Sequence, residues 1–213
     1  MITNRFLLSA VTNPTNPIQN LINSYNKNPS RQAEKPITDF LSFLKNNELN
    51  FSNLNQEYPK FPFWLLQTPD IDFSLINYSK SEVPHYIIKN RYHEKVTNFP
   101  NYVPRFTDGS KIGNQYTGYA FSINGEVKNF KLHKCSSNYT AELIAIFHCL
   151  KSIKTKEKSK NYLIQSDSVS SLTSILNIFS TDKFVQDIHQ QLNKLKSRNI
   201  NIKLTYIPSH IGI

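Results

Sequence analysis

Three acidic residues in the second half of the chain stand where strands and helices are expected to begin or end. Asp108 follows a short strand candidate in Thr-Asp-Gly-Ser, Glu142 opens a predicted helix in Thr-Ala-Glu-Leu, and Asp167 follows another strand candidate in Gln-Ser-Asp-Ser. If the two strands are neighbours, both aspartates project from one edge of a sheet. A helix packed on that sheet would then bring Glu142 beside them.

Such a group of carboxylates suits phosphoryl-transfer chemistry. The three charges repel one another, and a divalent cation relieves that repulsion. Oxygen ligands favour Mg²⁺ or Mn²⁺ over zinc. Two such ions ~3.5–4 Å apart can activate a water and stabilise the leaving oxygen of a phosphodiester. Each residue alone also has an ordinary interpretation, as a turn, a partner of the helix dipole or a helix cap. The prediction therefore depends on the three occurring together in this order of elements.

Residues 101–213 contain the elements that must position this group. Asn124-Gly125 is a strong signal for a tight hairpin between two strands. Apolar residues at helical spacing, Leu143, Ile146 and Leu150 among them, predict a helix after Ser137. The expected order is three strands, a helix, a strand, two helices and a strand, which specifies an α/β fold with a mixed five-stranded sheet flanked by helices. The strands are expected at 102–107, 116–123, 127–133, 162–166 and 200–207, and the helices at 138–154, 169–179 and 184–196.

Residues 1–100 are expected to form an irregular segment. Pro59, Pro62, Pro69, Pro84 and Pro100 argue against long regular elements there. Two short helices are predicted, at 18–25 and at 37–44. The sequence thus places a boundary near residue 100, followed by a second domain at 101–213.

Charge and composition narrow the classes of function. The chain has a net charge of +10, and residues 101–213 hold 15 Lys and Arg against 7 Asp and Glu, a net of +8. This excess indicates either a polyanionic partner or a solvated lysine-rich surface. Cys135 and Cys149 are too few for a disulfide framework, so reduced thiols and an intracellular location, nuclear or cytoplasmic, are expected. No apolar run reaches the ~18 residues of a membrane span.

Four segments, at 107–110, 140–143, 166–168 and 207–213, resemble in order the motifs of type 1 ribonuclease H domains. The nearest likeness is to the domains at the C-terminus of non-LTR retrotransposon reverse transcriptases. It covers residues 103–213, and the spacings between Asp108, Glu142, Asp167 and His210 are 34, 25 and 43 residues. Residues 1–100 loosely resemble the segment between polymerase and ribonuclease H in such elements.

The resemblance implies an endonuclease that cuts the RNA strand of RNA–DNA hybrids. Asp108 would bridge two Mg²⁺ ions, which Mn²⁺ can replace, with Glu142 and Asp167 as further ligands. His210 would assist proton transfer or product release. Asn138 would read the minor groove, where the 2′-hydroxyl marks RNA. Gly109, Ser110 and Ser168 complete the expected substrate contacts, and lysines 151, 154, 156, 158 and 160 either hold phosphates or form an ordinary solvated helix end.

The sequence departs from the family pattern in two places. Tyr206 stands where relatives often carry Trp. The sequence ends at Ile213, whereas the family continues with a helix that bears a fourth aspartate ligand. We therefore expect a C-terminally truncated domain. The alternatives to an active enzyme are a catalytically impaired remnant that binds nucleic acid and a fragment with no independent role.

Overall fold

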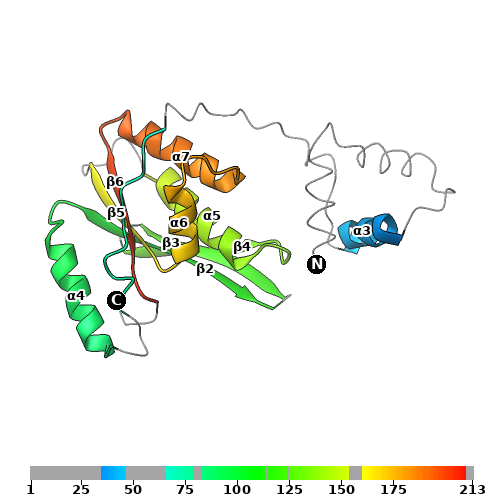
Figure 1. Ribbon diagram of the computed structural model, residues 1–213, viewed down its shortest axis with the longest axis horizontal. Coiled ribbons are helices and arrows are strands. Elements are labelled where there is room, and N and C mark those ends of the chain that lie inside the picture. The colour runs from blue at the N-terminus through cyan, green and yellow to red at the C-terminus, as the bar shows by residue number, and fades with distance from the viewer. Residues whose placement is uncertain are drawn as a thin grey trace. The chain divides into compact units, whose positions relative to one another are not determined.

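The computed structural model describes residues 35–46, 66–78, 83–113, 115–123, 125–153 and 160–209 (Figure 1). The chain divides into two compact units, residues 1–59 and residues 60–213. In the first unit, α3 (Lys35–Asn46) contains the helix predicted at 37–44, with Phe40 buried. Pro36 suits the first turn of this helix because its missing N–H has no intrahelical partner there. The helix predicted at 18–25 lies outside the described residues.

A six-stranded mixed sheet organises the second unit, in the order β1-β6-β5-β2-β3-β4. Neighbouring strands in β2–β3–β4 are antiparallel, whereas β2, β5, β6 and β1 pair in parallel. The expected mixed α/β sheet is confirmed, with one strand more than predicted. The strands are β1 (Ile71–Asp72), β2 (Val103–Ile112), β3 (Tyr116–Ile123), β4 (Glu126–Leu132), β5 (Asn161–Ser166) and β6 (Asn201–Tyr206).

The three helices predicted after the hairpin are present as α5 (Asn138–Lys151), α6 (Val169–Leu176) and α7 (Lys183–Lys196). Side-chain oxygens at their N-caps, from Ser137, Ser168 and Asp182, accept hydrogen bonds from backbone N–H groups that lack partners within the helix. Helix α6 ends three residues before its predicted end. The reason is local: the side chain of Asn177 accepts the backbone N–H of Phe179, which stays exposed.

The predicted end of the first strand at Asp108 is wrong, because β2 continues to Ile112. Its first half pairs in parallel with β5, as far as Thr107 opposite Ser166. Its second half pairs with β3, from Thr107 opposite Phe121 to Ile112 opposite Tyr116. The dipeptide Asp-Gly resembles a turn in the sequence, but here pairing with β3 keeps the backbone extended.

Residues 66–100 also differ from the irregular segment that the prolines suggested. Helix α4 (His85–Thr97) starts directly after Pro84 and buries Ile88 and Tyr92. Lys95 on this helix contacts Asp72 of β1 at 3.1 Å and Thr205 of β6 at 2.5 Å. The prolines flank a helix instead of preventing one. The boundary expected near residue 100 accordingly falls inside the compact unit 60–213.

Helices cover both faces of the sheet (Figure 1). Ile164 of β5 and Leu204 of β6 point into the main core beneath α5, α6 and α7. Thr205, which contacts α4 through Lys95, points to the opposite face because successive strand residues alternate. Both cysteines are free thiols, and no described helix is long and apolar enough to cross a membrane.

We expect Ile164→Ala to lower the free energy of unfolding by about 2–5 kcal/mol, because it leaves a cavity at a fully buried position in the central strand β5. Urea denaturation measures this change. Val127→Ala, at a position that is 64% exposed on β4, is the control and should change stability by less than about 0.5 kcal/mol. Equal effects of the two substitutions would contradict the assigned core.

Candidate active site

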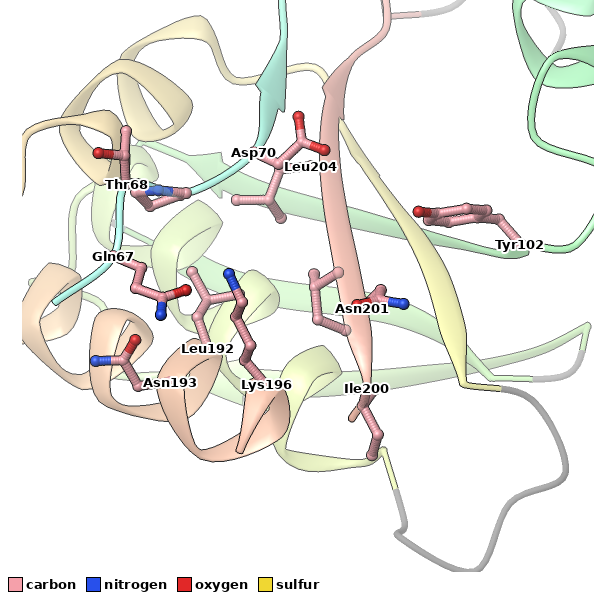
Figure 2. A pocket seen from close by; sticks show the side chains of 12 residues that line it. Gln67, Thr68, Asp70, Tyr102, Leu192, Asn193, Lys196, Ile200, Asn201 and Leu204 are labelled. Carbon is pink, nitrogen blue, oxygen red and sulfur yellow. The ribbon is translucent and has the colours of Figure 1, made fainter. Parts of the chain in front are cut away.

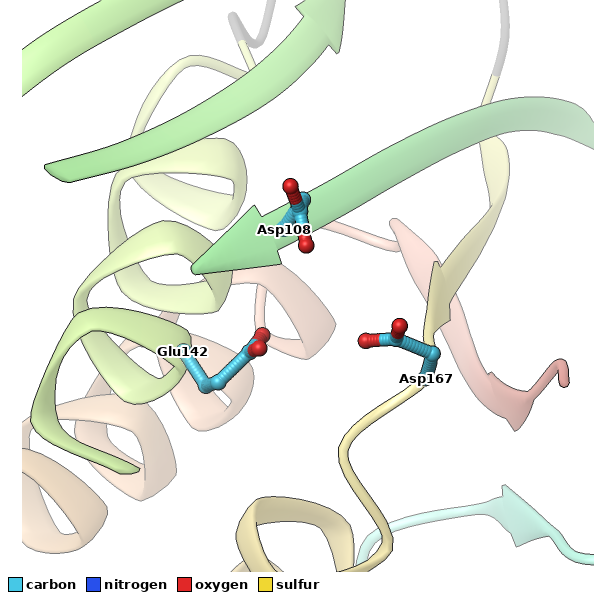
Figure 3. Close-up of side chains that lie close together, drawn as sticks. All are labelled: Asp108, Glu142 and Asp167. Carbon is cyan, nitrogen blue, oxygen red and sulfur yellow. The ribbon is translucent and has the colours of Figure 1, made fainter. Parts of the chain in front are cut away.

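The parallel pairing of β2 with β5 places two aspartates side by side. Thr107 of β2 and Ser166 of β5 form the last partner pair of this ladder. Asp108 and Asp167 directly follow these two residues in the sequence. Helix α5 supplies Glu142 from its first turns. Figure 3 shows the three side chains turned toward a common point, and one ligand oxygen from each lies within 4.8 Å of the others. The structure thus brings together the three carboxylates that the sequence pointed to.

Gly109 allows α5 to approach β2 closely enough for this arrangement. A Cβ atom at this position would lie 2.6 Å from the backbone nitrogen of Glu142 and 2.9 Å from the carbonyl carbon of Ala141. Backbone atoms cannot move aside as a flexible side chain can. The backbone N–H of Gly109 also donates a hydrogen bond to the carboxylate of Glu142. The glycine next to Asp108 therefore fixes the position of the helix that carries the second carboxylate.

Burial and neighbouring charge together make Glu142 an unusual carboxylate. Its side chain is 3% exposed, and burial, followed by the charges of Asp167 and Asp108, raises its pKa from 4.5 to about 8. The hydrogen bond from Gly109 opposes this rise. Its Oε2 atom is buried and accepts no hydrogen bond within the described part of the chain. A cation at this point would satisfy that oxygen and relieve the repulsion.

The three carboxylates differ in their access to solvent. Glu142 is buried, Asp167 is partly buried and Asp108 is exposed. The site is therefore closed on the side of α5 and open at Asp108. Tyr206, the strand partner of Ser166, lies near Asp167, and burial together with the charge of Asp167 raises the pKa of its hydroxyl. Because Tyr206 pairs with Ser166, the residue before Asp167, it lies at the edge of the site.

The other predicted site residues lie around this group or outside the described residues. Ser110 follows Asp108 by two positions on β2 and is exposed, on the same side of the strand. Asn138 is the exposed first residue of α5, and Ser168 is the N-cap of α6, directly after Asp167. His210 is outside the described residues. So are lysines 154, 156 and 158, whereas lysines 151 and 160 are described and exposed.

A family model for RNase H matches residues 100–213, more than half of the chain. The chain belongs to the RNase H family. The matched region contains β2 to β6 and all three carboxylates of the site. Membership supports a ribonuclease activity on the RNA strand of RNA–DNA hybrids, which the family binds, and the family generally uses divalent metal ions. No curated protein sequence matched the chain significantly.

A separate cavity of about 210 Å³ lies at the other end of the RNase H sheet, between α7, the start of β6 and residues 67–70 (Figure 2). Its lining includes the apolar residues Leu192 and Ile200 and the polar residues Asn193 and Lys196. None of the three clustered carboxylates lines it. The carboxylate cluster and this cavity therefore lie at opposite ends of the sheet.

We expect Gly109→Ala to destabilise the RNase H domain by about 1–3 kcal/mol, because the added methyl group forces α5 away from β2. Urea denaturation measures the loss. Ser110→Ala, one residue along the same strand and exposed, is the matched control and should stay within about 0.5 kcal/mol of the original chain. If Gly109→Ala were equally neutral, the close helix contact would not exist in solution.

The raised pKa of Glu142 predicts an unusual dependence of stability on pH. Between the ordinary pKa of 4.5 and the folded value of about 8, the folded state retains a proton that the unfolded state has lost. This group's contribution to the free energy of unfolding therefore falls as pH rises through that range. Without added metal, Glu142→Gln should remove this decline, as measured by denaturation from pH 5 to 8.5.

Glu126→Gln at the exposed start of β4 serves as the control for the same chemical change. Its stability should follow the pH dependence of the original chain. Parallel curves for all three proteins would show that Glu142 titrates normally in the folded state.

Proposed function

We propose that this RNase H domain hydrolyses the RNA strand of RNA–DNA hybrids, with two divalent cations held by Asp108, Glu142 and Asp167. The observation that carries the proposal is the approach of the three carboxylates to within 4.8 Å inside a domain that matches the RNase H family. We infer Mg²⁺ as the natural ion, with Mn²⁺ as a substitute, because all three ligands are carboxylates and hard cations prefer oxygen.

The donor set fits such cations. The buried Oε2 atom of Glu142 has no hydrogen-bond partner among the described residues. Burial, followed by repulsion from the two aspartates, raises the pKa of Glu142. A bound cation would give this oxygen a partner, and its positive charge would offset the repulsion among the three carboxylates. Histidine and cysteine are absent from this group of residues, which argues against zinc.

The protein's own residues contribute position and charge. Asp108 would hold the ions from the open side of the site, and Glu142 and Asp167 would hold them from the more buried side. The N–H of Gly109 orients the Glu142 carboxylate before substrate arrives. When bound, the cations supply an activated water and charge stabilisation at the leaving oxygen. Catalysis of this kind depends on positioning more than on covalent chemistry of the protein.

Recognition of the hybrid is assigned to groups around the carboxylates. We propose that Asn138 at the start of α5 contacts the minor groove, where the 2′-hydroxyl distinguishes RNA from DNA. Gly109, Ser110 and Ser168 contact the adjacent nucleotides, and His210 assists proton transfer or product release. The order and spacing of the four sequence motifs support these roles. They also support a type 1 enzyme of the kind found in retrotransposon reverse transcriptases. We propose a nuclear or cytoplasmic location, because two cysteines are too few for a disulfide framework.

A second candidate function is binding of the hybrid without cleavage. The net charge of +8 on residues 101–213 favours it, because this charge attracts phosphates whether or not the site is active. The two candidates differ in one respect only, which is turnover of the RNA strand.

We expect the chain to cleave a labelled RNA–DNA hybrid in Mg²⁺ or Mn²⁺, and Asp108→Asn to reduce the rate by at least ~10²-fold, because it removes a ligand charge at the open side of the site. Gel analysis of the RNA strand, with and without chelator, measures this. Asp39→Asn on the exposed surface of α3 is the matched control and should retain the full rate.

Binding that weakens steeply with salt, without cleavage in either metal, would instead establish the second candidate. Cleavage that survives in Asp108→Asn would show that a different group of residues, or a contaminating nuclease, performs the reaction.

A further inference from the structure

The loop between β4 and α5 is attached to the β2–β3 hairpin through two of its carbonyl oxygens, those of Ser136 and Lys134. The backbone oxygen of Ser136 accepts hydrogen bonds from Lys111 Nζ at 2.5 Å and from Thr117 Oγ1 at 3.2 Å. Lys111 Nζ also donates to the backbone oxygen of Lys134 at 3.2 Å. Two side chains of the sheet therefore hold the short loop that leads into α5.

Lys111 and Thr117 are partners across the β2–β3 ladder, so both point to the face covered by α5. Gly109 lies two residues before Lys111 on the same face of β2. The same strand thus contacts the start of α5 at two places. Gly109 touches the helix backbone at Ala141 and Glu142, and Lys111 holds the loop just before the helix begins.

The attached carbonyl leads directly into the cap of α5. Ser137, the next residue, is the N-cap, and its side-chain oxygen accepts the N–H of Thr140 at 3.0 Å. Its backbone oxygen accepts the N–H of Ala141, also at 3.0 Å. Asn138 and Glu142 lie in these first turns. A displacement of Ser136 would therefore move both residues relative to Asp108, which belongs to the sheet.

The charge of Lys111 is not explained by helix stability. A cation near a helix N-terminus is unfavourable, because the helix dipole is positive there. Lys111 forms no ion pair among the described residues, and its two partners are neutral carbonyl oxygens. A charged donor forms stronger hydrogen bonds than a neutral one, so an ammonium group can hold two carbonyls at once. The charged hydrogen bonds of Lys111 therefore serve to hold the loop before α5 in place.

We infer that Lys111 is a positioning residue for the RNase H reaction, which sets the location of Asn138 and Glu142 through Ser136, with Thr117 as a weaker second anchor. This inference rests on the proposed function for its effect on turnover. It involves no direct contact of Lys111 with substrate or metal.

Kinetics separate positioning from simple loss of charge. We expect Lys111→Met to lower kcat by about tenfold at saturating hybrid, an effect that persists at high salt, because misplaced groups slow the chemical step. Lys111→Arg, which can still donate to two carbonyls, should recover most of kcat. The control is Lys131→Met on exposed β4, where Lys131 is the partner of Gly118 and points to the opposite face. It should raise only KM, and only at low salt.

Hydrogen exchange tests the attachment without any need for activity. Backbone amides of residues 134–141 should exchange several-fold faster in Lys111→Met, and less so in Thr117→Val, which keeps the side-chain shape. Lys131→Met should leave them unchanged. Mn²⁺ affinity, measured by calorimetry, should fall in Lys111→Met as Glu142 moves.

The outcomes separate the inference from the proposed function. Unchanged exchange in Lys111→Met overturns the inference, even if the original chain cleaves hybrid. Faster exchange with unaltered kcat and Mn²⁺ affinity also overturns it, because the loop would then not position the site. If the original chain fails to cleave hybrid, the proposed function fails, while exchange and Mn²⁺ binding still decide the role of Lys111.

Discussion

The close contact between α5 and β2 at Gly109 is the constraint on which the rest of the site depends. A helix and a sheet normally keep side chains between them, but here a glycine lets the helix backbone approach the strand directly. This approach places Glu142 beside two aspartates that the sheet alone already brings together. Because Gly109 has no side chain, Glu142 can lie beside the pair formed by Asp108 and Asp167. The same contact buries Glu142, which converts a surface acid into one with a strongly raised pKa.

Such a cluster is unfavourable for the folded chain by itself. Burial makes ionisation of Glu142 costly, and the charge of each aspartate adds to that cost. The surrounding core compensates through the packing of α5, α6 and α7 on the sheet. Either a proton or a metal cation would relieve these unfavourable electrostatics, so the two would compete for Glu142. Metal affinity and protonation of the site would then be linked, and a rise in pH would favour the metal.

Local signals in the sequence predicted more than half of this architecture. The Asn124-Gly125 turn, the capping residues Ser137 and Ser168 and the apolar stripe of α5 each act over a few residues, and each led to the right element. Contacts between distant segments were not predictable in this way. The pairing of β2 with β3 keeps Asp108 within a strand, and β1 forms only against β6. Lys111 showed no signal at all, because its partners are backbone oxygens, which every residue possesses.

The position of Asp108 follows from an exchange of neighbours along β2. Up to Thr107 this strand pairs with β5, and from Thr107 onward it pairs with β3. Because β5 ends at this level, β2 has no neighbouring strand on that side at Asp108. Pairing with β3 on the other side still holds the backbone of β2 in place. Asp167 leaves β5 at the same level, so the opening is lined by two carboxylates. Open α/β sheets bind ligands where neighbouring strands part. Here one strand ends while its neighbour continues, and this gives Asp108 both an exposed side chain and a backbone held by β3.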